Sequence, residues 1–196
     1  MLIFRPLLIA YKGYSLYKNI AGVLLCLLML NACVAYPTTR TYFKPDLNDG
    51  QLTPSMGCGY HTTKGDAIIK TLGDATLTVM PEYVSGEKLK ITLLVRSKSK
   101  ADVNALLPDG IFVSLSNTLS EIYPAKLSVT EQESAAGEHF SQWHVLVFPL
   151  SVDEIETFKL TIPWSNSSDP SSEDGLLNFN FEKVEVADFY YNSINC

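Results

Sequence analysis

The chain has 196 residues, of which 46% are hydrophobic, and it carries 15 basic against 21 acidic side chains, a formal charge of −6. This length predicts one domain, or at most two small ones, with an ordinary hydrophobic core. An acidic chain without clustered Lys and Arg excludes nucleic acid as a partner, and it also argues against electrostatic attachment to an anionic lipid surface.

The first 32 residues differ from the rest of the chain in charge and hydropathy. They hold Arg5, Lys12 and Lys18 and no acidic residue, so the remaining residues hold 12 basic against 21 acidic side chains, a formal charge of −9. Ile20–Leu30 is an apolar run of eleven residues, whereas a helix that spans the hydrocarbon core needs about 20. Basic residues before such a run and small residues after it are typical of a secretory signal peptide.

The sequence Leu30-Asn31-Ala32-Cys33 follows this run. It resembles the lipobox of bacterial lipoproteins, in which an apolar residue, a variable small residue and Gly, Ala or Ser precede the modified cysteine; Asn31 is a less usual occupant. The resemblance implies a signal peptide over residues 1–32, cleavage after Ala32, and palmitate-type acyl chains on Cys33. Each buried methylene contributes about 0.8 kcal/mol, so two or three such chains attach a protein to a membrane essentially permanently.

Two further features of the N-terminal region are the residue after Cys33 and the unusual length of the leader. In Gram-negative lipoproteins an Asp at that position commonly retains the protein in the inner membrane. Val34 therefore favours the periplasmic face of the outer membrane, with the inner membrane and the cell surface as alternatives. The stretch before Ile20 is long, and Leu2–Phe4 and Leu7–Ala10 make it unusually apolar for a leader; a wrongly assigned start codon would explain both features. An uncleaved signal anchor, or ordinary secretory cleavage that leaves Cys33 as a free thiol, is the alternative to lipidation.

Four cysteines are present. Cys26 falls within the signal peptide, and the lipobox assigns Cys33 to lipid. In an oxidising compartment the remaining pair, Cys58 and Cys196, predicts one structural disulfide that ties the end of the domain to its beginning. A redox-active site would usually contain Cys-x-x-Cys, which is absent.

Residues 33–57 contain three prolines, a run of threonines and the turn signal Asn48-Asp49-Gly50, and no helical or strand period persists there. This pattern predicts a flexible tether between the lipid and a folded domain over residues 58–196.

From Asp66 onward the apolar residues recur with a period of two, as in strands that bury one face. The alternating runs lie at residues 75–79, 89–95, 111–115, 125–129, 143–147, 158–164 and 177–181. The phase of the last run changes at Glu182-Lys183, which suggests a bulge, and Ser151–Glu154 has the spacing of a short capped helical turn. About eight strands without long helices predict an all-β fold, an antiparallel two-sheet β-sandwich of immunoglobulin-like type, with a closed barrel as the alternative.

Candidate chemical groups are few. The histidines His61, His139 and His144 do not have zinc-ligand spacing. The alternation places His144 opposite Trp143 and Val145, so we expect it to face solvent. Tyr60 and His61 near the expected disulfide, and the acidic loop Asp169–Asp174, are the places for a small ligand or a calcium ion. Neither has a recognised motif, so the sequence predicts no catalytic, cofactor-binding or metal-binding residue.

These observations favour a non-enzymatic interaction module, anchored to the membrane by its N-terminal lipid, that contacts a protein partner in an assembly of the cell envelope. Lipoproteins of type VI secretion systems have a comparable architecture, but no motif links this chain to them, and the mature domain resembles no specific family. The alternatives are a lipoprotein that binds a small ligand or a metal ion and, with less support, a hydrolase.

Overall fold

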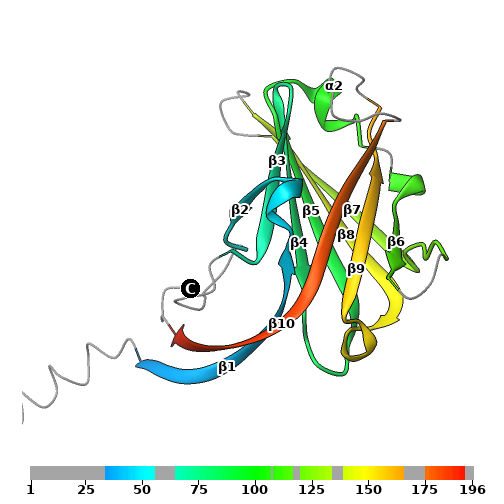
Figure 1. Cartoon of the computed structure of the whole chain (residues 1–196). Helices are drawn as coiled ribbons and strands as arrows, with labels where there is room; N and C mark the ends of the chain where they lie inside the picture. The colour runs from blue at the N-terminus through cyan, green and yellow to red at the C-terminus, as the bar shows by residue number, and fades with distance from the viewer. Residues whose placement is uncertain are drawn as a thin grey trace, which may run out of the picture.

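The structure, a computed structural model, describes residues 34–55, 65–106, 108–116, 120–133, 139–165 and 175–192. Within these ranges the chain forms ten strands in two antiparallel sheets, which confirms the predicted all-β sandwich (Figure 1). The four-stranded sheet has the order β1-β10-β9-β6, and the six-stranded sheet has the order β2-β3-β4-β5-β8-β7.

The strands are β1 (Val34–Pro45), β2 (Gln51–Thr53), β3 (Ala67–Leu72), β4 (Ala75–Glu82), β5 (Lys88–Ser97), β6 (Phe112–Leu115), β7 (Lys126–Glu133), β8 (Phe140–Ser151), β9 (Thr157–Pro163) and β10 (Leu176–Asn192). The helical segments are η1 (Leu47–Asp49), α2 (Lys100–Val103), η2 (Pro108–Gly110) and η3 (Val152–Glu154). The predicted helical turn is therefore present as η3, although the Ser151 side chain does not cap it.

The core lies between the two sheets and is built from the alternating apolar residues that the sequence identified. β4 and β5 contribute residues that are fully buried, and β9 and β10 face them from the other sheet with Leu160 and Phe179. Burial of each such side chain contributes about 1.5–3 kcal/mol to the free energy of folding, so the buried side chains of these four strands are the main source of stability.

The predicted flexible tether is wrong for residues 34–45 and 51–53, which form β1 and β2. β1 pairs with β10 without interruption from Val34 to Pro45. The prolines that argued against regular structure are tolerated because β1 is an edge strand, with a neighbour on one side only. The folded unit therefore begins before residue 58.

Buried polar contacts hold β1 against the rest of the fold. Arg40 of β1 forms an ion pair with Asp66, and the two side chains are only 13% and 8% exposed. Asp66 also accepts hydrogen bonds from the backbone N and the Oγ of Ser55, both at 2.6 Å. This cluster joins β1 to the segments that precede and follow the undescribed residues 56–64.

The predicted bulge at Glu182-Lys183 is also wrong, because the register between β1 and β10 is continuous from Phe181 to Asn192. What changes at that point is the set of strands that pair with β10. The first part of β10 pairs with β9 as far as Glu182, whereas the second part pairs with β1 alone. Figure 1 shows β1 and this second part curving away together as a two-stranded ribbon.

Candidate functional site

The residues that the sequence singled out for lipidation and for a disulfide, Cys33, Cys58 and Cys196, lie outside the described residues. The same holds for Tyr60, for His61 and for the acidic loop at residues 169–174. In the part of the chain that the structure describes, no group of three or more His, Cys, Asp or Glu side chains is placed to share a metal ion.

His144 is buried, with an exposed fraction of only 2%, so the prediction that it faces solvent is wrong. Its Nε2 lies 2.8 Å from the Oε1 of Gln142, and the Nε2 of Gln142 donates to Glu131 at 3.0 Å. Burial lowers the pKa of His144, and the nearby charge of Glu131 acts in the opposite direction. Because the side chain is enclosed in the sandwich, it is not positioned as an accessible ligand or base.

The outer face of the four-stranded sheet carries rows of side chains that cross from strand to strand. Side chains two residues apart on a strand share a face, so paired strands place their polar residues side by side. From β6 across the sheet, the rows are Ser116, Thr157, Glu182 and Lys44; then Ser114, Lys159 and Asn180; then Phe112, Thr161 and Asn178.

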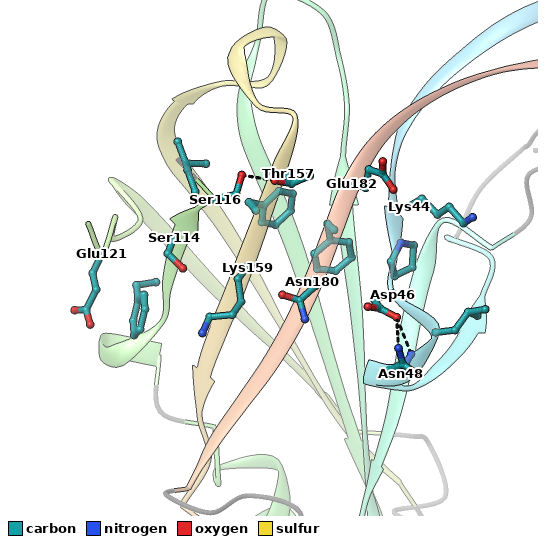
Figure 2. Close-up of a pocket in the computed structure, with 16 residues that line it drawn as sticks. Lys44, Asp46, Asn48, Ser114, Ser116, Glu121, Thr157, Lys159, Asn180 and Glu182 are labelled. Carbon is teal, nitrogen blue, oxygen red and sulfur yellow. Dashed lines mark hydrogen bonds between the residues drawn. The ribbon is translucent and has the colours of Figure 1, made fainter. Parts of the chain in front are cut away.

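Hydrogen bonds between neighbouring strands fix two of these rows. The hydroxyls of Ser116 and Thr157 lie 2.5 Å apart, and Thr161 Oγ1 donates to Asn178 Oδ1 at 3.0 Å. The central row contains a cation: Lys159 is exposed and lies between its cross-strand partners Ser114 and Asn180. The floor of the site is therefore polar, with an ammonium group near its middle (Figure 2).

One wall of the site is η1, which continues the sheet beyond the end of β1. The backbone N of Asp46 donates to the carbonyl of Asn180 at 2.9 Å. The Oδ2 of Asp49 accepts from both the backbone N and the Nδ2 of Asn180, at 2.6 and 3.1 Å. Asp46 also accepts from the backbone and side chain of Asn48, so η1 is held rigidly and presents Leu47, 65% exposed, at the rim.

The opposite wall is β6 with the segment that follows it. Val113 and Ile122 exchange two backbone hydrogen bonds, each 2.9 Å long, which hold this segment beside β6. The rings of Phe112 and Tyr123 lie 5.8 Å apart, and Tyr123 donates to the carboxylate of Glu121 at 2.6 Å. This hydrogen bond raises the pKa of the Tyr123 hydroxyl.

Between these walls lies an open trough of about 920 Å³. Its charged lining consists of Lys44, Asp46, Glu121, Lys159 and Glu182. Figure 2 shows Glu121 on the β6 side, Lys159 on the floor, and Asp46 and Glu182 toward β1. A central cation flanked by carboxylates on both sides is suited to hold a polar partner in one orientation.

Sequence reasoning missed the trough, although part of the signal was visible. The polar residues that alternate with the core residues of β9 and β10 indicate an exposed polar face. The sequence does not show which strands lie side by side or that η1 closes one end of the trough. Both depend on contacts between segments more than a hundred residues apart, such as that between Asp49 and Asn180.

Comparison with known proteins identifies no relative: no family model matches the sequence, and neither a curated protein nor a solved structure is detectably similar to it. Among the described residues, no helix has both the length and the apolar character needed to cross a bilayer.

Proposed function

We propose that the mature chain is a lipid-anchored envelope protein that binds a protein partner in the trough of the four-stranded sheet and catalyses no reaction. The lipobox that ends at Cys33 supports the anchor, and the acyl chains would hold the protein at the periplasmic face of the outer membrane. The observation that carries the binding role is the exposed ammonium group of Lys159 between the carboxylates of the two walls.

The distribution of charge favours a polypeptide over a small apolar ligand. Small-molecule sites are lined mainly by apolar groups, with a few polar ones. The lining of the trough includes apolar side chains such as Phe112 and Leu115, but it also carries five charged side chains on different elements, more than the few polar groups of such a site. Charge patterns of this kind set the orientation and the specificity of a protein partner.

A polar small ligand is the second candidate, because a volume of about 920 Å³ lies within the usual range of ligand sites, roughly 300–1,000 Å³. A bound ligand would raise the melting temperature by mass action. Thermal shift against a panel of sugars, amino acids and divalent metals separates the candidates, since a shift that Lys159→Glu removes would favour the small ligand.

The proposal is tested by photo-crosslinking in intact envelopes. A photo-reactive amino acid at Ser114, on the floor of the trough, is expected to yield discrete adducts with one or a few proteins. Lys159→Glu should lower adduct yield about tenfold, which corresponds to about 1.4 kcal/mol of binding energy. Lys98→Glu is the matched control, because Lys98 is exposed and lies outside the trough.

Cys33→Ala supplies the second control. Without the lipid, the protein should leave the membrane fraction and the adducts should decline with it. Adducts that are equally abundant in Lys159→Glu and Lys98→Glu would contradict the trough as the binding site. A Cys33→Ala chain that stays in the membrane fraction at the wild-type level, with an unaltered N-terminal mass, would remove the lipid anchor from the proposal.

A further inference from the structure

The edges of the two sheets differ in how they are protected from pairing with other chains. An edge strand exposes unpaired N–H and C=O groups, and proteins usually block such edges with prolines, short strands, bulges or covering segments. β1 contains Pro37 and Pro45, β2 has three residues, and β6 has four and is bridged by Ile122. Each of these edges is therefore a poor template for a further strand.

β7 is the exception among the described edges. It has eight residues, contains no proline, and pairs with β8 in one continuous register. Seven of its eight residues are exposed, and its middle residues Ser128, Val129 and Thr130 carry no charge. Val129 is 46% exposed although the alternation predicted a core position, because β7 lies at the end of the sheet.

The C-terminal end of β7 adjoins a small pocket that bears on what this edge binds. The pocket encloses about 220 Å³ and is formed by β7, the beginning of β8 and α2. Glu131 and Glu133 contribute carboxylates, Lys100 contributes one ammonium group, and Val103 and Phe140 contribute apolar surface. Apolar walls with an excess of carboxylate suit a side chain with an aliphatic stem and a cationic head, which is Lys or Arg.

We infer that β7 is a strand-addition site for an extended segment of a partner protein, which pairs antiparallel with β7 and inserts a Lys or Arg into this pocket. Backbone hydrogen bonds would supply the affinity, and the pocket would supply the specificity. In the antiparallel orientation, the cationic residue lies near the N-terminal end of the added segment, opposite Glu133. A second copy of the mature chain is disfavoured as the occupant because both copies would carry a formal charge of −9.

This site is independent of the trough, because the trough contains no residue of β7 and lies on the other sheet. The probe is an octapeptide, Arg-Thr-Arg-Thr-Val-Thr-Val-Glu, with an acetylated N-terminus and an amidated C-terminus. In antiparallel pairing its two arginines lie opposite Glu133 and Glu131, and its C-terminal glutamate lies opposite Lys126. The readout is hydrogen exchange of the full chain with and without the peptide. We expect the peptide to slow exchange of β7 amides about tenfold or more and to leave β1 and β2 unchanged.

Two variants and two modified peptides make the test specific. Glu133→Lys should weaken binding about tenfold, whereas Glu154→Lys, the same change at an exposed residue of η3, should not. Two peptides, N-methylated at the odd-numbered or at the even-numbered residues, should differ in affinity. In an added strand only every second N–H group points toward β7, so methylation of that set alone should block binding. Lys159→Glu should not affect peptide binding, so failure of the trough and failure of this site are distinguishable.

Three results would overturn the inference. The first is that millimolar peptide leaves the exchange of β7 amides unchanged. The second is that both N-methylated peptides bind as tightly as the unmodified peptide. The third is that a peptide of reversed sequence binds as tightly as the original peptide.

Discussion

His144 and Gln142 are polar side chains that enter the sandwich from β8. The Nδ1 of His144 is buried without a hydrogen-bond partner among the described residues, and its Nε2 depends on Gln142. A buried polar atom without a partner costs about 1–3 kcal/mol, and a buried imidazolium would cost more. The neutral form of His144 is therefore part of the folded state.

At the residue scale we predict that acidification destabilises the fold through His144. Its folded pKa lies below the usual value of 6.5, so the unfolded chain binds the proton more readily. The free energy of unfolding should then be highest above pH 6.5 and should fall as the pH drops from there toward the lower, folded pKa. Urea denaturation of His144→Leu should show a smaller loss across this range.

His139→Leu, the same change at an exposed histidine, is the control for this prediction. At pH 8, His144→Leu removes one hydrogen bond, worth about 1 kcal/mol. A wild-type stability that is constant from pH 8 to pH 5 would contradict the prediction.

The wrong prediction for His144 shows that alternation does not determine which face of a strand is buried. In β8 both faces carry apolar residues: Leu146 and Phe148 face the core, while Trp143 packs on the other face of the sheet against Met80 and Leu94. Because one face of such a strand looks as apolar as the other, the pattern identifies a strand correctly but assigns its buried face wrongly.

At the scale of elements, the ion pair of Arg40 and Asp66 links β1 to the segment that leads into β3. Arg40→Leu leaves the Asp66 carboxylate buried without its cation, and removal of one partner from a buried pair usually costs about 3–5 kcal/mol. We expect a loss of about 3 kcal/mol in urea denaturation, since Asp66 keeps its hydrogen bonds to Ser55.

Lys90→Ala is the matched control for this variant. Lys90 and Glu82 also form an ion pair, but their side chains are 45% and 48% exposed, and such surface pairs contribute less than about 1 kcal/mol. Adding Asp66→Asn to Arg40→Leu should recover part of the stability. A loss in Arg40→Leu no larger than that in Lys90→Ala would contradict the structural role of the buried pair.

β1 was missed because its sequence has the composition of a linker. Pro37 and Pro45 lower the strand propensity, and only Phe43 of the described side chains belongs to the core cluster. The strand exists because β10 supplies a long partner and because the prolines lie on an edge. Strand propensity depends on such neighbours more than on the residues themselves.

At the scale of the whole molecule, the β1–β10 ribbon occupies part of the segment that the sequence assigned to a flexible tether. Val34, which follows Cys33, pairs with Asn192, and the trough begins near Pro45 at the other end of β1. A strand rises about 3.3 Å per residue, so the ribbon would set the trough up to about 35 Å from a lipid on Cys33. An ordered spacer would fix the height of the binding site above the membrane.

The expected disulfide between Cys58 and Cys196 would brace this ribbon and remains a prediction. Ser55, close to Cys58 in sequence, is bonded to Asp66, and Asn192 precedes Cys196 by four residues. Closing a loop of about 140 residues stabilises a fold by roughly 5 kcal/mol on the chain-entropy model, so Cys196→Ser should lower stability by up to that amount. Mass analysis of the mature chain without reductant should find neither thiol open to alkylation; modification of either would refute the disulfide.

The sequence by itself determined the all-β class, the positions of most core strands, the acidic character and the expected membrane address. These features are local: a period of two marks a strand, and an apolar run before a small residue and Cys marks a lipobox. The tertiary structure alone decided that β1 is a strand, that His144 is buried, and that the trough and the β7 edge exist. Each depends on which distant strands pair, because strand pairing determines the edges of the sheets and brings residues such as Ser114, Lys159 and Asn180 together.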